Sequence, residues 1–459
     1  MSSNPYAGIL QKQRDFFHSN QTKDLKFRRK QLKHLLEVIT TNEDVLFDAI
    51  YQDIGKSKLE TIATEIGLIK SEINHTLTHL DEWAAKEYVP TVLANFPASS
   101  YVISEPLGSV LIIGAWNYPL LLSFHPMISA IAAGNTVIVK PSELAANTSR
   151  AITQLINENF DTQVAYAIEG GIKETTDILN NKFDKIFFTG STPVGKIIYQ
   201  SAAKNLTPVT LELGGKSPAI ISSDASIKLA AKRIIWGKFV NSGQTCVAPD
   251  YLLVDQKIRE KFITELKNQL VAIHGENPEN SEGLTRIINE KNFDRLQRLI
   301  DEKLVIHGGT SSKENLFIAP TLLFPVPKEH PIMEDEIFGP ILPILEYSEL
   351  NEAIEFIKSK PKPLSLYTFT NSSKTKQKVL DEISFGGGGI NETLVHLGNH
   401  HLPFGGVGSS GMGNYHGKYG FDIFSHKKAI HEKSNLFEPN IKYPPFTNFK
   451  TKIIKWLLQ

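Results

Sequence analysis

Cysteine is almost absent from this sequence, since Cys246 is the only one in 459 residues. A single cysteine cannot form a disulfide within the chain, which excludes a disulfide-stapled fold. Such scarcity is typical of a reducing compartment, and we expect the cytoplasm. The opening residues, MSSNPYAGILQKQRDFF, also lack the basic and then apolar run of a secretory signal.

Neither sign of charge is in excess, because 49 lysine and arginine residues balance 49 aspartate and glutamate residues. A balanced surface has no net field to attract nucleic acid or anionic lipid, so we expect neither as a partner. The chain is too long for one core, because single cores stop growing near roughly 250–300 residues. Its hydrophobic content of 41% is ample for two or three domains.

One stretch has no charged residue at all, from Val110 to Val139, and is long enough to cross a bilayer. Glycines and prolines interrupt it, however. We therefore expect a strand (Ser109–Ile113), a loop, a buried helix (Leu121–Ala133) and a second strand (Thr136–Val139), with no membrane span. The C-terminal tail, 436–459, ends in an apolar run too short to span, and we expect a frayed or packed helix there.

Hydrophobic periodicity predicts the organisation of the chain. Two amphipathic helical stretches come first, roughly Leu25–Tyr51 and Leu59–Lys86. Short β-branched runs then alternate with helical stretches, a pattern typical of βαβ units around parallel sheets. The sequence therefore predicts an α/β fold with two such domains in series. Between helices and strands, Glu87–Pro106 has the prolines and alternation of an extended excursion or hairpin, which could form a subunit contact.

Two strand-to-helix turns could hold a ligand. The run FFTGSTPVGK contains Gly190 and Gly195 before a helix, where exposed N–H groups favour anions. It matches neither the dinucleotide nor the P-loop spacing, so an ordinary glycine-bounded turn is equally consistent. The run VIVKPSE places Lys140 at a strand end and Glu143 in the following turn, where ribose-binding groups occur. A solvated surface lysine is the alternative.

Three further stretches could carry acid–base or nucleophilic chemistry. Glu212 in TLELGG lies among apolar residues, which should raise its pKa toward that of a general base; pairing with Lys216 would make it structural instead. Cys246 in NSGQTCVAPD is either a nucleophile or an inert small hydrophobe. Gly243, three residues earlier, permits an unusual backbone turn. The acidic run MEDEIFGPILPI, 333–344, gains meaning only in combination with the others.

Taken together, five motifs resemble the signatures of the NAD(P)-dependent aldehyde dehydrogenase family. The distances agree as well, with 34 residues from Glu212 to Cys246 and 90 from Cys246 to Glu336. The length and the C-terminal run LPFGGVGSSGMGNYHGKYGFDIFSH resemble the shorter class 3 branch. The resemblance covers nearly the whole chain, and its motifs are GAWNYP (Gly114–Pro119), FTGSTPVG (Phe188–Gly195), LELGGKSP (Leu211–Pro218), NSGQTCVAPDY (Asn241–Tyr251) and EIFGP (Glu336–Pro340).

The resemblance implies a role for each catalytic residue. Cys246 would attack the aldehyde carbon, and the Asn117 amide would hold the resulting oxyanion together with the Cys246 backbone N–H. Hydride transfer to the cofactor would leave a thioester on Cys246. Glu212 would then activate the water that hydrolyses it. Transfer of the acyl group to CoA or phosphate is an alternative, as is a non-catalytic binding protein on the same fold.

The resemblance also implies a cofactor site for NAD or NADP. Lys140 and Glu143 would face the adenosine ribose, and Gly190, Ser191 and Gly195 would lie against the pyrophosphate. Glu336 would bind the nicotinamide ribose, with Phe338 near the ring. The two cofactors cannot be separated by sequence, because Glu143 would disfavour a 2′-phosphate while Lys140 could receive one. We expect no metal.

Domain boundaries and partners follow from the same resemblance. Residues 1–86 and 105–212 would form a Rossmann-like cofactor domain, and 213–405 a catalytic domain. Residues 87–104 and 406–435 would form a small β element that bridges two subunits of a homodimer. The substrate would be a small aldehyde, with a lean toward medium-chain aliphatic or aromatic ones.

Two stretches depart from the expected pattern. FGGGGINET has four consecutive glycines, Gly386–Gly389, before Asn391, which predicts an unusually mobile backbone near the substrate side. The paired His400 and His401 could line the substrate entrance, although solvated loop histidines are the simpler interpretation.

Overall fold

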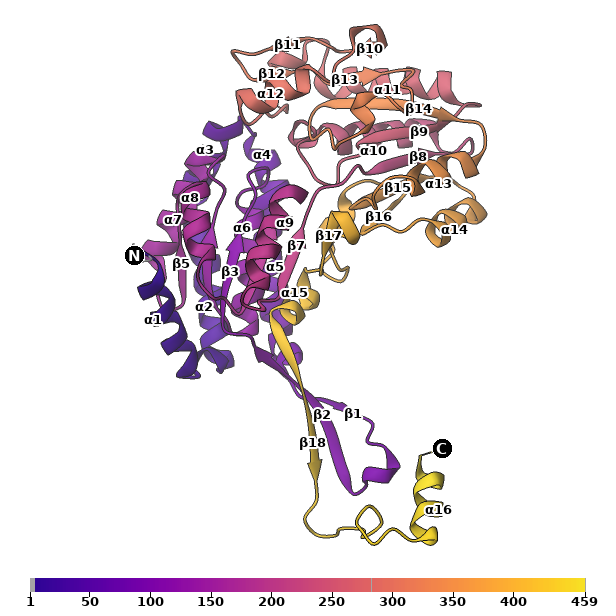
Figure 1. The fold of residues 1–459 in the computed structure, drawn as a ribbon. Helices are drawn as coiled ribbons and strands as arrows, with labels where there is room; N and C mark the ends of the chain where they lie inside the picture. Colours follow the sequence, from indigo (N-terminus) through magenta and orange to yellow (C-terminus); the bar gives the residue numbers. More distant parts are fainter. Residues whose placement is uncertain (1–4, 282, 459) are drawn as a thin grey trace.

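The computed structural model of the chain describes residues 5–281 and 283–458. Two α/β bodies lie one above the other, and a narrow arm extends from the first body (Figure 1). The fold therefore confirms two parallel-sheet α/β domains in series with a small β element. Within the described residues, no helix is both long and apolar enough to cross a membrane.

The first body is built on a six-stranded sheet in which five adjacent strands are parallel and the sixth, at one edge, is antiparallel. Every residue of its central strands is buried, because helices cover both faces of the sheet. In spatial order the strands are β17 (Gly411–Met412), β7 (Val209–Glu212), β6 (Lys185–Thr189), β3 (Ser109–Ile113), β4 (Thr136–Lys140) and β5 (Ala165–Ala167).

Ten α-helices surround this sheet among the described residues, nine from the N-terminal part and one from the C-terminal part. They are α1 (Ala7–His18), α2 (Leu25–Thr41), α3 (Glu43–Ile54), α4 (Lys58–Thr61), α5 (Gly67–Ala84), α6 (Leu121–Ala133), α7 (Ala146–Asn159), α8 (Ile172–Leu179), α9 (Thr192–Ala203) and α15 (Gly417–Ile423). The charge-free stretch is β3, α6 and β4, as predicted.

Each of the two predicted N-terminal helical stretches is divided in the structure. The first breaks at Asn42, whose side-chain amide donates to the Val38 carbonyl (2.8 Å) and so competes with continued helix. The second is interrupted between α4 and α5 by a π-helical turn, Ile62–Ile66. Neither break can be predicted from hydrophobic periodicity, because the helical spacing of apolar residues continues through both.

The second body has a seven-stranded sheet that is parallel except for one edge strand, with a two-stranded ribbon beside it. Its strands in spatial order are β10 (Val305–His307), β13 (Thr321–Leu323), β14 (Ile341–Tyr347), β9 (Tyr251–Asp255), β8 (Pro218–Ile221), β15 (Ser365–Phe369) and β16 (Gly387–Ile390), and the ribbon is β11 (Ser311–Ser312) with β12 (Phe317–Ile318). Its helices are α10 (Ile227–Phe239), α11 (Arg259–His274), α12 (Glu290–Gln297), α13 (Leu350–Lys358) and α14 (Ser373–Glu382).

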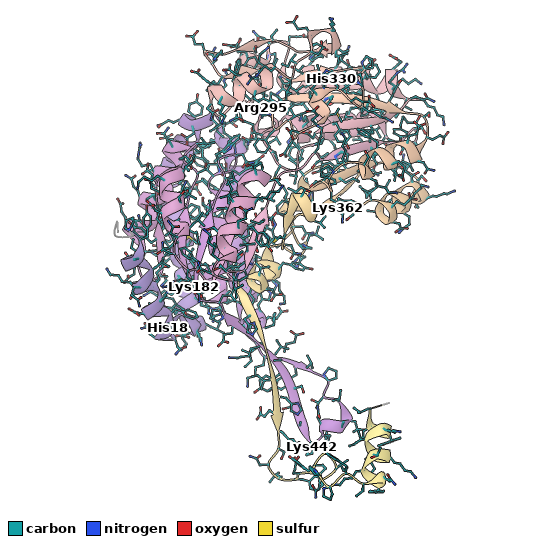
Figure 2. The ribbon with its side chains drawn as sticks, in the orientation of Figure 1. His18, Lys182, Arg295, His330, Lys362 and Lys442 are labelled. Carbon is teal, nitrogen blue, oxygen red and sulfur yellow. The ribbon has the colours of Figure 1, made fainter. Side chains whose placement is uncertain are left out.

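The arm is a three-stranded antiparallel sheet made of β1 (Glu87–Val89), β2 (Ala98–Pro106) and β18 (Ser425–Lys433). The expected hairpin is therefore present. The chain then runs through Lys442, labelled in Figure 2, to the last helix, α16 (Asn448–Leu457), which lies beside the arm.

The segment 406–435, assigned from the sequence to the bridging element, is divided in the structure. Its strand β17 pairs with β7 in the first sheet, and α15 packs against α5 and α6. Only β18 joins the arm. The glycine-rich run that contains β17 has too few apolar residues to predict a strand, so its sequence suggests a loop.

Candidate active site

The predicted site residues of the first body share one edge of its sheet. Strands β7, β6, β3 and β4 are parallel neighbours, so their carboxyl ends lie side by side. Glu212 ends β7, Ser191 follows β6, Asn117 follows β3 and Lys140 ends β4. Such an edge is where open α/β sheets bind ligands.

The cysteine is presented by a backbone turn that few sequences adopt. After α10, Asn241 and Ser242 have left-handed φ values of 53° and 50°, and Gly243 has 70°. A Cβ at Gly243 would lie 2.3 Å from the Gly339 carbonyl oxygen, so the position needs glycine on two counts. The turn leaves Cys246 partly exposed and free.

Gln244 fixes this turn to the second body. Its side-chain amide donates to the carbonyls of Asn241 (3.1 Å) and Arg286 (3.0 Å), and its oxygen accepts the Ile288 N–H (3.1 Å). A fully satisfied buried amide of this kind specifies one geometry. The sequence reasoning noted Gln244 only as a polar neighbour of the cysteine, and its role is to hold the loop.

The Cys246 sulfur is surrounded by groups that disfavour its thiolate. Burial raises the pKa of the thiol, and the nearby carboxylates of Glu336 and Glu212 raise it further. Both predicted carboxylates are therefore close enough to act on the sulfur. The resting thiol stays protonated at neutral pH, and a nucleophilic role requires a base or an added positive charge.

Glu212 is buried without a counter-charge. Its side chain is 3% exposed, and neither carboxylate oxygen has a hydrogen-bond partner among the described residues. Burial therefore raises its pKa well above the usual range. The alternative of pairing with Lys216 is wrong, because Lys216 Nζ lies 2.6 Å from Asp250 Oδ2 and donates to two backbone carbonyls.

Asn117 is hydrogen-bonded to the cysteine loop through both its side-chain amide and its backbone carbonyl. Its side-chain Nδ2 donates to the Gln244 carbonyl (3.1 Å), and its own carbonyl accepts from the Asn241 amide (2.8 Å). Beside it, the Tyr118 hydroxyl lies 2.6 Å from Thr245 Oγ1. The amide keeps a second N–H that the Gln244 contact does not use.

Glu336 reaches the same centre from the second body. A Cβ at Gly214 would lie 2.0 Å from Glu336 Oε2, so the carboxyl depends on glycine there. Burial and the Asp250 carboxylate raise the pKa of Glu336 to about 8, against the Gly215 N–H and the charges of Lys216 and Lys238.

Phe338 and Trp116 form the aromatic part of the site. Phe338 has a left-handed φ of 50°, and its ring packs edge-on against Trp116 at 5.3 Å between centroids. The contact joins the loop after β3 to the loop before β14, so it links the two bodies. A strained backbone at such a position is common at functional sites.

The remaining cofactor candidates lie farther along the sheet edge. Lys140 is buried and its Nζ is 2.7 Å from Glu143 Oε2, so these two form an ion pair, not a solvated lysine. Ser191 precedes α9 without capping it through its side chain. Gly195 lies inside α9, where a Cβ would be 2.6 Å from Leu213, so it permits close packing of helix on strand. Gly190 is similarly crowded by the Phe188 ring.

Three of the four consecutive glycines lie in an ordered strand, which corrects the expectation of a mobile backbone. Residues Gly387–Ile390 form β16 and pair in parallel with β15. A Cβ at Gly388 would lie 1.9 Å from the Leu366 carbonyl oxygen, so the glycine serves close backbone approach. Asn391 then bonds through its side chain to the Thr370 backbone N–H and carbonyl, both at 2.8 Å.

The paired histidines differ from one another. His400 is not a solvated loop residue, because its ring contacts the buried Glu72 (2.7 Å) and the Ser71 hydroxyl (2.9 Å). His401 is exposed, and its ring meets the edge of His75. The solvated interpretation therefore holds only for His401.

Lys238 is a site residue that the sequence reasoning missed. Its side chain is fully buried on α10, and its Nζ has no hydrogen-bond partner in the described part of the chain. Burial lowers its pKa to about 8. Lys238 follows Ala231, Ile234 and Ile235 on the buried face of the helix, and this helical spacing was the available signal.

No group of three or more potential metal ligands occurs within the described ranges 5–281 and 283–458.

The chain resembles known proteins along nearly its whole length. The model for "Aldehyde dehydrogenase family" matches residues 6–430. A 4,4'-diaponeurosporen-aldehyde dehydrogenase of Staphylococcus aureus is 50% identical over 442 residues, which cover 96% of each chain. Aldehyde dehydrogenase family 3 member H1 of Arabidopsis thaliana is 45% identical over 457 residues, covering 98% of this chain and 94% of that one.

A solved structure has the same fold throughout. The substrate-bound state of Staphylococcus aureus AldH superposes with a TM-score of 0.97 at 49% identity, covering 98% of this chain and 99% of that chain. The likeness therefore includes both bodies and the arm.

Proposed function

Because the chain belongs to the aldehyde dehydrogenase family, in its class 3-like branch, we propose a covalent mechanism for its oxidation of aldehydes with NAD or NADP. The observation that carries the proposal is the meeting of four distant segments around one sulfur. Glu212 and Glu336 act on the charge of Cys246, and Asn117 is hydrogen-bonded to its loop.

The first step forms a carbon–sulfur bond. The Cys246 thiol gives up its proton to a base, and the sulfur attacks the aldehyde carbon, which moves an electron pair onto the carbonyl oxygen. The unused N–H of Asn117 and the Cys246 backbone N–H then stabilise this oxyanion. A donor of this kind typically contributes about 2.7–4 kcal/mol to the transition state.

The second stage removes the acyl group. A bound nicotinamide would supply the hydride acceptor, and loss of hydride from the former aldehyde carbon would leave a thioester on Cys246. Glu212 takes a proton from water as the water attacks this thioester, and the carboxylic acid leaves with the sulfur restored. A buried carboxyl with a raised pKa and no partner suits a base that works on an entering water.

The residues present fit a nicotinamide dinucleotide along the sheet edge. We assign Lys140 and Glu143 to the adenosine ribose and the turn from Gly190 through Ser191 to Gly195 to the pyrophosphate. Support comes from the exposed start of α9, since N–H groups at a helix start favour anions. Glu336 would bind the nicotinamide ribose and Phe338 would pack near the ring.

The first body would then be the cofactor domain (1–86 and 105–212) and the second the catalytic domain (213–405). Cys246 packs against the same core cluster as several other partly buried apolar side chains, which include Trp116, Leu121 and Leu397. This apolar setting supports a medium-chain aliphatic or aromatic aldehyde as the substrate. A reactive thiol must stay reduced, so we also place the protein in the cytoplasm.

The test of the covalent mechanism is Cys246→Ala, assayed for aldehyde-dependent formation of reduced cofactor. We expect turnover to fall by at least about a thousandfold while cofactor binding, followed by fluorescence quenching, changes little. Full turnover by the variant would contradict the mechanism. A panel of aliphatic, aromatic and polyene aldehydes, each with NAD and with NADP, defines the substrate and cofactor preference.

Acyl transfer to CoA or phosphate is the second candidate. Glu212 argues against it, because thiolysis and phosphorolysis have no use for a water-activating base. Activity that is undiminished when CoA and phosphate are omitted rules this candidate out.

A further inference from the structure

A buried ion pair lies behind the loop that carries Asn117. Lys56 Nζ is 2.7 Å from Glu65 Oε1, and neither side chain has any exposed area. Lys56 lies between α3 and α4, and Glu65 belongs to the π-helical turn, Ile62–Ile66. π-Helical turns occur frequently at functional sites, because they re-aim a side chain within an otherwise regular helix.

The pair contacts the second half of the loop after β3, from Asn117 to the start of α6. Glu65 Oε2 accepts the N–H groups of Leu120 (2.9 Å) and Leu121 (3.3 Å), which begin α6. Lys56 Nζ lies 3.5 Å from the Asn117 carbonyl oxygen and 4.3 Å from the centre of the Tyr118 ring. The loop between Asn117 and α6 is therefore fixed by one carboxylate and one ammonium.

The same segment of chain also holds the cysteine loop. Glu60, in α4, accepts the Asn241 backbone N–H at 2.8 Å, and the Asn241 side chain bonds to the Asn117 carbonyl. Residues 56–65 thus touch the two sides of the site whose separation sets the geometry of an oxyanion.

Stability alone gives little reason for an ion pair in this place. Removing two charges from water is costly, and well-packed apolar side chains commonly stabilise a core equally well. A buried charged pair can instead fix the positions of the groups to which it is hydrogen-bonded.

We propose that Lys56 and Glu65 are positioning residues that fix the Asn117 amide relative to the Cys246 sulfur. The inference rests on the proposed oxyanion role of Asn117. One N–H of the Asn117 side chain donates to the Gln244 carbonyl. The direction of the other N–H therefore depends on the conformation of the loop that carries Asn117. A misplacement of about 1 Å can cost about a hundredfold in rate, so the rigidity of the loop matters to the reaction.

The experiment is a double-mutant cycle on the hydride-transfer step. Lys56→Met/Glu65→Gln removes both charges of the pair and keeps an oxygen to accept the Leu120 N–H. In rapid mixing with saturating cofactor, we expect hydride transfer to slow by about tenfold to a hundredfold. A larger isotope effect with 1-deuterated aldehyde should accompany the loss. In an Asn117→Ala background, the same pair of changes should slow the step by less than about twofold.

Two controls separate positioning from loss of fold. Lys58→Met breaks the neighbouring ion pair with Asp44, which is of similar length (2.8 Å) but exposed, and hydride transfer should not change. In the cofactor-free double variant, the rate of Cys246 alkylation by iodoacetamide should stay within about twofold of wild type, since Gln244 still holds the cysteine loop.

Three results would overturn the inference. Equal slowing in the wild-type and Asn117→Ala backgrounds would show that the pair does not act through Asn117. An unchanged rate in the double variant would show that the pair positions nothing, and a collapse of Cys246 alkylation would show a general loss of structure. If Asn117→Ala alone leaves hydride transfer unchanged, the proposed function of Asn117 fails instead, and that outcome is distinct from the other three.

Discussion

Burial decides the protonation states in this site. Glu212 and Cys246 have raised pKa values, and Lys238 has a lowered one, because burial disfavours the charged form of each group. Burial therefore favours the uncharged form of all three groups, although Lys238, with a pKa of about 8, is still mostly protonated at pH 7. Binding of substrate and cofactor would change the surroundings of Glu212 and Cys246, and with them the pKa values of both groups.

The first prediction concerns Lys238. Its pKa is about 8 in the folded chain but near 10.5 when unfolded, so the unfolded state binds more protons between these values. The stability contributed by this group is therefore present above pH 10.5 and is lost as the pH falls through 8. We expect Lys238→Met to stabilise the protein relative to wild type by about 3 kcal/mol at pH 7 and by much less at pH 10.5.

The measurement is the free energy of unfolding by denaturant for both proteins at each pH. Taking the difference between variant and wild type cancels the other titrating groups. A difference that does not depend on pH would show that Lys238 has the same pKa in the folded and unfolded states.

The sequence predicts the reactive residues of the site but not the buried charged residues around them. Cys246 and Glu212 stand out because one is unique and the other is a carboxylate among apolar residues. Lys56, Glu65 and Lys238 look like ordinary surface charges in a polar or amphipathic segment. Their roles depend on which neighbour the fold supplies, and that information is not local.

Helices and strands with long apolar runs are predicted well from the sequence, whereas a glycine-rich strand is not. Helix α6 and strand β3 have the predicted bounds, because their apolar runs are long and have clear ends. Strand β16 was not predicted, since four glycines give no β-branched or apolar signal. The reason for those glycines is contact between backbones, which is a property of the pairing with β15.

A pair of substitutions in β16 tests this account. Gly388→Ala would place a Cβ 1.9 Å from a backbone oxygen, whereas Gly387→Ala would meet only the His396 ring, at 3.5 Å or more. We expect the first to destabilise the protein by about 1–3 kcal/mol or more and the second to be nearly neutral. Thermal unfolding of the two variants, side by side, is the measurement. Similar melting temperatures would show that β16 shifts freely.

The arm is the feature of the whole molecule that a single chain leaves unexplained. It projects away from both bodies and exposes large apolar side chains at its tip, with Leu93 60% and Phe96 65% exposed (Figure 1). Apolar groups gathered on an exposed projection mark a protein contact. We propose that the arm packs against a second copy of the chain in a homodimer.

The dimer has its own test. Leu93→Glu/Phe96→Glu should convert the protein to a monomer in sedimentation velocity, because two charges would be buried without partners. Leu206→Glu is the control, since Leu206 is 91% exposed on the first body and lies outside the arm. Identical sedimentation of wild type and the arm variant would contradict the proposed interface.

The domain plan was predictable because βαβ alternation extends over hundreds of residues and is insensitive to local detail. The return of residues 411–423 to the first body was not, since a two-residue strand and a short helix leave no pattern to detect. Their placement depends on the β7 edge being open to pairing.

The most direct test of the central claim is a single-turnover experiment on Glu212→Gln. The variant is mixed with aldehyde and cofactor, and both reduced cofactor and the mass of the protein are followed. If Glu212 activates the water, each Cys246 should release about one equivalent of reduced cofactor and then stall as an acyl-enzyme, heavier by the acyl group. Steady turnover at the wild-type rate, with no covalent adduct, would contradict the account.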